Sequence, residues 1–225
     1  MLPRVTSTVA SGNHDGAAGR SQENVVARPE IWLCRHGETE WSRDRRHTSH
    51  TDLPLTDKGF DEADLLASVL ARVPFDLVMT SPARRAAETA ARAGFEGARV
   101  ERDAREWDYG EYEGLTTDAI RERVPGWTVW THDLPGGETA AQVTARADRL
   151  IDSVCAAAAT RALLFSHAHF LRVLAARWIG LPAESGVRLL LGTGAVSVLG
   201  WERETRAIVR WNVPASRSSG PAAAP

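Results

Sequence analysis

Short apolar runs that alternate with segments of helical periodicity constrain the fold of this chain more than any other feature. Three of these β-prone runs lie at 31–34, 75–80 and 162–165, with a shorter one at Val100. Helices are predicted between and after them, at 57–72, 82–93, 117–124, 138–159 and 170–179. Strands that alternate with helices favour a mostly parallel sheet with helices on both faces. The chain is therefore expected to form an α/β three-layer sandwich.

The end of the chain carries a different pattern. Two β-like runs, 195–201 and 207–213, are separated only by a polar segment at 202–206. This spacing predicts a hairpin, which would add an antiparallel edge to the sheet. A chain of 225 residues is long enough for one well-packed α/β domain, predicted at 29–213. The flanking segments 1–28 and 214–225 are rich in small and polar residues and are expected to be disordered tails.

Charge and cysteine content narrow the class of protein. The net charge of −2 and the apolar content of 43% argue against general binding to nucleic acid or to an anionic membrane. No stretch approaches the roughly 20 apolar residues of a membrane span. The two cysteines, Cys34 and Cys155, lie in apolar contexts, which favours reduced thiols and a cytoplasmic location.

Polar residues with distinctive chemistry follow the first apolar run. Arg35, His36 and Gly37 come directly after the strand predicted at 31–34. Ligands of open α/β sheets bind at the carboxyl ends of the strands. Arginine offers a fork of donors suited to phosphate, and a neutral histidine offers a nucleophilic or basic nitrogen. The pattern suggests a phosphoryl group held by Arg35 and attacked by His36. The same residues could instead form a capped strand end with a hydrogen-bonded histidine, so the functional interpretation depends on site residues in other segments.

Three other segments bring charged or titratable residues to the same predicted edge. Arg84 and Arg85 follow the second strand, Glu106 lies in the acidic and aromatic loop 105–114, and His167 follows the strand at 162–165. Arginines and histidines together would form a pocket for a dianion. A carboxylate beside a bound phosphate is repelled by like charge, so its pKa should rise and it can hold a proton for a leaving alkoxide.

Five motifs in order resemble the histidine phosphatase superfamily, in its phosphoglycerate-mutase-like branch. They are Arg35-His36-Gly37-Glu38-Thr39, Asp52-Leu53-Pro54-Leu55-Thr56 with Gly59, Ser81-Pro82-Ala83-Arg84-Arg85-Ala86-Ala87-Glu88-Thr89-Ala90, Glu106 with Gly110 and Glu113-Gly114, and Ser166-His167. Each motif alone is weak, but five in order over 31–213 are specific. The resemblance selects Arg85 over Arg84 as the phosphate-binding arginine.

The resemblance implies a mechanism for a phosphomonoester hydrolase. It implies that His36 is the nucleophile that becomes phosphohistidine, that Glu106 is the proton donor, and that Arg35, Arg85 and His167 bind the phosphoryl oxygens. No cofactor and no metal are implied. A metal site at His47 and His50 or at His167 and His169 is the competing interpretation, but the spacing is loose and the arginines would repel a cation.

The substrate is less constrained than the chemistry. Ser42, Thr48 and Ser49 stand where this chain departs from the usual motif residues, and they are candidate substrate contacts. The motif wording most resembles sugar-phosphate phosphatases of the sedoheptulose-bisphosphatase type and broad-specificity acid phosphatases, which implies a small phosphorylated metabolite as the partner. A homodimer is left open. The segment with Trp127, Trp130, His132 and 136–138 would either roof the pocket or pack under a loop.

Three alternatives to a metabolite phosphatase are carried forward. A phosphoglycerate mutase would have a longer insertion after the acid loop than the interval from Glu106 to His167 provides. A phosphoprotein phosphatase would need a shallow, open pocket. A non-catalytic module that binds phosphorylated ligands would be expected to lose His36 or Glu106, and both are present.

Overall fold

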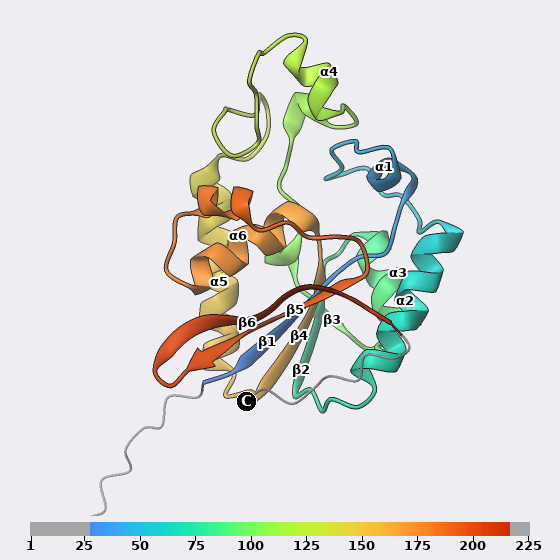
Figure 1. Cartoon of the computed structure of the whole chain (residues 1–225), viewed down its shortest axis with the longest axis vertical. Helices are drawn as coiled ribbons and strands as arrows, with labels where there is room; N and C mark the ends of the chain where they lie inside the picture. Colours follow the sequence, from blue (N-terminus) through green and yellow to red (C-terminus); the bar gives the residue numbers. More distant parts are fainter. Residues whose placement is uncertain (1–27, 217–225) are drawn as a thin grey trace, which may run out of the picture.

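The sheet is the centre of the fold (Figure 1). A computed structural model describes residues 28–216, so most of the tails expected at 1–28 and 214–225 lies outside the described residues. The six strands run in the order β3-β2-β4-β1-β5-β6. Their bounds are β1 Glu30–Arg35, β2 Leu77–Thr80, β3 Arg99–Val100, β4 Arg161–Ser166, β5 Ala195–Glu202 and β6 Thr205–Pro214.

Strand direction follows the prediction from the sequence. β1, β2, β3 and β4 pair in parallel, and β5 and β6 form the antiparallel edge. Arg35 at the end of β1 lies opposite Ser166 at the end of β4, and Thr80 at the end of β2 lies opposite Phe165. The loops that follow β1, β2 and β4 therefore leave the sheet at one common edge.

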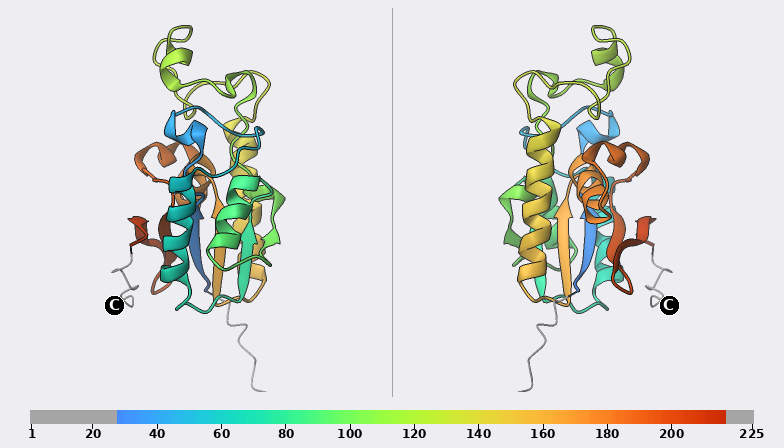
Figure 2. Two further views of the ribbon diagram at one scale, coloured as in Figure 1. Left: turned by 90° about the vertical axis from the view of Figure 1, so that its right-hand side faces the viewer. Right: turned by 90° about the vertical axis from the view of Figure 1, so that its left-hand side faces the viewer.

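Helices cover both faces of this sheet, which confirms the three-layer sandwich (Figures 1 and 2). On one face, Leu66 and Leu70 pack with Trp32 and Cys34, whereas Ile31 and the other alternate strand residues face the opposite layer. The α-helices are α1 Glu40–Arg43, α2 Asp57–Leu70, α3 Arg84–Arg92, α4 Thr117–Arg121, α5 Ala140–Ala156 and α6 Ala168–Trp178. Short 3₁₀ helices are η1 Arg102–Ala104, η2 Gly110–Tyr112 and η3 Ala183–Arg188.

Side chains cap the starts of α1, α2 and α3, and at α3 the capping side chain comes from a residue distant in sequence. Helix α2 begins at Asp57, as predicted, and Thr56 caps it: Thr56 Oγ1 accepts from Gly59 N at 3.1 Å. Helix α3, expected from Pro82, begins at Arg84, whose N–H donates to the Asp52 carboxylate at 2.8 Å. A capping box of Thr39 and Ser42 begins the short helix α1, which was not among the predicted helices.

Three further features belong to the fold. Helix α6, expected from Phe170, begins at Ala168, so His167 is its N-cap residue. Cys34 is buried in β1 and Cys155 is half-buried in α5, and neither forms a disulfide. Among residues 28–216, no helix combines the length and the apolar character that crossing a bilayer requires.

Candidate functional site

The end of β1 fixes His36 between the sheet and two helices. Its backbone N–H donates to Ser166 O at 2.9 Å, and the next residue, Gly37, donates to Thr89 Oγ1 of α3 at 3.0 Å. A Cβ on Gly37 would lie 2.3 Å from the carbonyl oxygen of Gly59 in α2. Only glycine fits at this crossing, which gives a physical reason for the two glycines of the first and second motifs.

The hydrogen bond of the His36 ring decides which nitrogen is free. Its Nδ1 lies 2.8 Å from the carbonyl oxygen of Gly37. A carbonyl only accepts, so Nδ1 carries the hydrogen and Nε2 keeps its lone pair. Burial, followed by the charges of Arg85 and Arg35, holds the pKa of His36 well below its usual value. The ring is therefore neutral near pH 7, with a nucleophilic nitrogen.

A second imidazole stands against the first. The ring centroids of His36 and His167 are 5.2 Å apart. Arg85 Nε donates to His167 Nδ1 at 3.2 Å, so His167 Nε2 carries the hydrogen and donates to Ser81 Oγ at 2.7 Å. Burial, together with Arg85, His36 and Arg35, lowers the pKa of His167 well below its usual value. Four of the motif residues thus meet at one place.

Arg85 is buried beside His167 and does not line the cavity. It is 1% exposed, and its guanidinium donates to the backbone carbonyls of Thr48, Ser49 and Thr51 at 3.2 to 3.3 Å. Burial lowers its pKa. Since Arg85 and His167 already bond to each other and to protein, direct contact with a phosphoryl oxygen would require these bonds to be exchanged.

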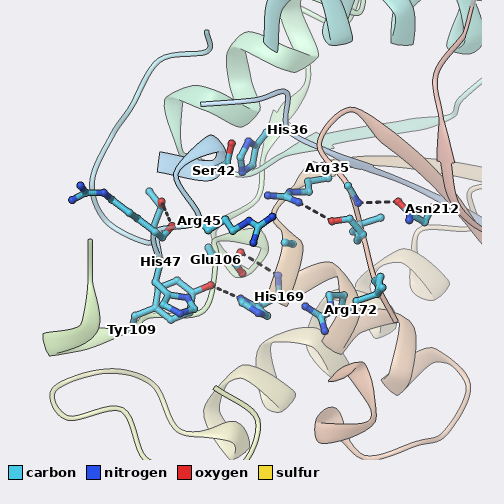
Figure 3. Close-up of a pocket in the computed structure, with 16 residues that line it drawn as sticks. Arg35, His36, Ser42, Arg45, His47, Glu106, Tyr109, His169, Arg172 and Asn212 are labelled. Atoms are coloured by element: carbon cyan, nitrogen blue, oxygen red, sulfur yellow. Dashed lines mark hydrogen bonds between the residues drawn. The ribbon is translucent and has the colours of Figure 1, made fainter. Parts of the chain in front are cut away.

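The cavity itself has a volume of about 420 Å³ and lies beside His36 (Figure 3). Arg35 enters it from β1 and donates from Nη1 to Leu191 O at 2.7 Å. Its Nε is buried and has no hydrogen-bond partner among residues 28–216. Burial lowers the pKa of Arg35 as well. A buried donor without an acceptor is costly, so the hydrogen-bonding capacity of Arg35 Nε is left unused by residues 28–216.

Glu106 is held at the cavity by the start of α6. Its carboxylate accepts from the backbone N–H groups of Trp107 at 2.9 Å, Phe170 at 2.8 Å and His169 at 3.1 Å. Both His36 and Glu106 line the same cavity. A neutral imidazole with a free nitrogen and a carboxyl group therefore line one space, each held by hydrogen bonds to the backbone.

The three candidate substrate contacts lie in different settings. Ser42 and Thr48 line the cavity, but the Ser42 hydroxyl donates to Thr39 O at 3.0 Å. Ser49 does not line the cavity, and its hydroxyl donates to the Glu113 carboxylate. A contact between Ser49 and substrate would require that bond to be exchanged.

Several residues that line the cavity were missed from the sequence. Tyr109 Oη lies 2.6 Å from His169 Nδ1. Burial raises the pKa of Tyr109 well above its usual value, and burial with Arg172 and His47 lowers that of His169. Arg45 and Arg172 add two further guanidiniums to the wall. A usable signal was the three-residue spacing of positions 169 and 172, which places both on one side of the first turns of α6.

The aromatic segment packs against residues of the cavity wall and does not line the cavity itself. Trp127 and Trp130 are 1% and 6% exposed and do not line the cavity, and neither does the exposed His132. The Trp130 ring lies 5.2 Å from the His169 ring. Of the two interpretations of this segment, packing under a loop is the one observed. Residues 28–216 contain no cluster of three or more His, Cys, Asp or Glu arranged to hold a metal ion.

Comparison with known proteins places these motifs in a family. The family model described as histidine phosphatase superfamily (branch 1) matches residues 31–214. The chain is 42% identical over 184 residues to an acid phosphatase of Mycobacterium tuberculosis, covering 80% of this chain and 91% of that protein. It is 33% identical over 191 residues to sedoheptulose 1,7-bisphosphatase of Saccharomyces cerevisiae, covering 69% of each.

The fold agrees with this assignment. A solved structure of an open reading frame from Mycobacterium tuberculosis superposes with a TM-score of 0.80 at 40% sequence identity. The match covers 84% of this chain and 99% of that chain. With the family model matching residues from β1 to the end of β6 and the paired histidines at the edge of the sheet, the chain belongs to branch 1 of the histidine phosphatase superfamily and is a phosphatase-type enzyme.

Proposed function

We propose that this enzyme hydrolyses small phosphomonoesters without a metal ion, through a phosphohistidine on His36. The observation that carries the proposal is the neutral His36 ring with Nε2 free, in a cavity that Arg35, with its unpartnered Nε, and Glu106 also line. Phosphoryl transfer depends mainly on positioning and on stabilising charge, and guanidiniums supply that charge here.

The proposed reaction has two steps. His36 Nε2 attacks phosphorus in line, the bond from phosphorus to the leaving oxygen breaks, and Glu106 gives its proton to that oxygen. Glu106, now a carboxylate, takes a proton from water, whose oxygen attacks phosphorus as the bond to Nε2 breaks. Inorganic phosphate leaves, and Glu106 is protonated again. Arg35 binds the phosphoryl oxygens, and Arg85 and His167 join it after exchanging their present bonds.

A small anionic metabolite, such as a sugar phosphate or bisphosphate, is the proposed substrate. The cavity volume of about 420 Å³ suits a molecule of this size, and four arginines line it: Arg35, Arg45, Arg46 and Arg172. Leu190 and Asn212 also line the cavity. The names of the relatives, an acid phosphatase and a sedoheptulose bisphosphatase, support the same class. Mutase activity, a cytoplasmic location and a homodimer stay predictions.

The test begins with the nucleophile. His36→Ala should abolish turnover of p-nitrophenyl phosphate and of sugar phosphates, and no alkali-stable phosphoenzyme should be trapped from it. Wild-type protein quenched in alkali during turnover should carry phosphate on His36, identified by mass spectrometry. Hydrolysis by His36→Ala at a rate near wild type would refute the assignment. A panel of sugar monophosphates, sugar bisphosphates, phosphoglycerates and a phosphopeptide then ranks substrates by kcat/KM.

A further inference from the structure

A buried arginine lies directly beneath the loop that carries Glu106. Arg146 of α5 is 2% exposed, and its guanidinium donates to the carbonyl oxygens of Asp103, Arg105 and Glu106, the last at 3.3 Å. Asp103 lies in η1, and Arg105 and Glu106 follow it outside any strand or helix. Arg146 therefore supplies hydrogen bonds that regular structure would otherwise provide.

Glu138 forms an ion pair with Arg146 and hydrogen-bonds to the same loop on both sides of Glu106. Its two carboxylate oxygens accept from Arg146 Nε and Nη2, each at 2.7 Å. They also accept from Arg105 Nη2 and from Asp108 N, each at 3.1 Å. The Glu138 backbone adds a bond from its N–H to Asp108 O at 3.0 Å.

The pair also reaches the structure that orients the Glu106 carboxylate. The Arg146 guanidinium lies 4.8 Å from the centre of the Phe170 ring, and Phe170 N donates to the Glu106 carboxylate. Trp107 Nε1 donates to Glu138 O at 2.9 Å, and Trp107 N donates to Glu106. Two of the three backbone donors to the carboxylate thus belong to residues that the pair contacts.

We propose that Glu138 and Arg146 are positioning residues for Glu106: a buried ion pair that holds its carboxyl group where the leaving oxygen is protonated. Arg146 does not line the catalytic cavity, nor does Glu138, so neither touches substrate there. The inference rests on the proposed acid role of Glu106. A pair that only stabilised the fold would affect all substrates alike, whereas a pair that positions the acid affects most the substrates that need protonation.

The experiment therefore compares leaving groups. Glu138→Gln keeps the size of the side chain but offers one acceptor oxygen where four donors converge, so the loop loses its anchor. An alkyl phosphate such as glycerol phosphate needs the acid, and p-nitrophenyl phosphate needs it far less. We expect kcat for glycerol phosphate to fall by about 10- to 100-fold and kcat for p-nitrophenyl phosphate by less than about threefold, with KM little changed.

A second variant covers the case in which Glu138→Gln does not fold. Arg146→Lys keeps both buried charges but cannot reach three carbonyls and both carboxylate oxygens at once, and it should show the same selective loss. Arg149→Gln is the matched control, because Arg149 lies on the same helix and pairs with the side chain of Asp103 at the surface. It should leave the ratio of the two rates unchanged.

Glu106→Gln separates the possible failures. If it shows the selective loss and both Glu138→Gln and Arg146→Lys slow the two esters equally, the positioning role is overturned while the proposed function stands. If Glu106→Gln itself slows both esters equally, the acid role fails, and the positioning role falls with it. Circular dichroism at the assay temperature, together with a thermal unfolding curve for each variant, ensures that only folded protein is compared.

Discussion

Buried histidines should make this protein less stable in mild acid. Burial, reinforced by neighbouring charges such as the arginines, holds the pKa of His36, His167 and His169 well below the usual value, and burial lowers that of His47 to about 4. In the unfolded chain a histidine has a pKa near 6.5. As pH falls below that value, the unfolded chain binds protons that the folded chain does not bind, so the free energy of unfolding decreases.

The size of the effect follows from these directions. Each histidine that stays neutral in the folded state lowers the free energy of unfolding by about 1.2 kcal/mol between pH 7 and pH 5.5. Four such histidines lower it by about 5 kcal/mol. A domain of this size has a free energy of unfolding of about 5–15 kcal/mol. Carboxylates such as Asp76, Asp108 and Glu113 have lowered pKa values in the folded state, and their contribution is lost only below about pH 4.5. The window from pH 6.5 to 5.5 therefore reports on histidines.

Urea unfolding at pH 7.0 and pH 5.5, in buffers free of phosphate, measures this loss. Phosphate must be absent because it would bind the folded state and mask the change. We expect a lower midpoint at pH 5.5 with a similar slope, and His47→Gln, which can still bond Thr117, should reduce the difference by about a quarter. A midpoint that is equal or higher at pH 5.5 would refute the reasoning, as would an unchanged difference in the variant.

Three further predictions concern catalysis. Gly37→Ala places a Cβ 2.3 Å from Gly59 O, so His36 must shift and kcat should fall at least about 10-fold. The control Gly97→Ala adds a Cβ in open space and should leave kcat unchanged. Equal activity in the two variants would count against the tight crossing. Tyr109→Phe removes the bond to His169 Nδ1. KM for sugar phosphates should rise about fivefold, with little change in KM for p-nitrophenyl phosphate. An unchanged KM for sugar phosphates would exclude a role of Tyr109 in substrate binding. Exhaustive chelation should leave turnover intact, and activity that returns only on adding a metal ion would contradict the mechanism.

Local patterns in the chain predicted the architecture well because burial leaves a clear periodicity. Each buried strand of the parallel sheet reads as a continuous apolar run, and the loops after β1 and β4 carry the histidines at the expected edge. Helix starts were less predictable. Arg84 begins α3 because Asp52, distant in sequence, accepts its N–H, and no local rule contains that bond.

Sequence alone determined which chemical groups reach the edge of the sheet, since strand ends and motif order fix Arg35, His36, Glu106 and His167 there. The tertiary structure decided which of them face the cavity and which stand behind it. Arg85 bonds to backbone carbonyls, His167 bonds to the Ser81 hydroxyl, and the two bond to each other, while Arg45, His169 and Arg172 join the wall. The reason is that a guanidinium or an imidazole bonds to the partners that the packing of separate loops brings within about 3 Å. A local sequence pattern does not determine the distances between separate loops.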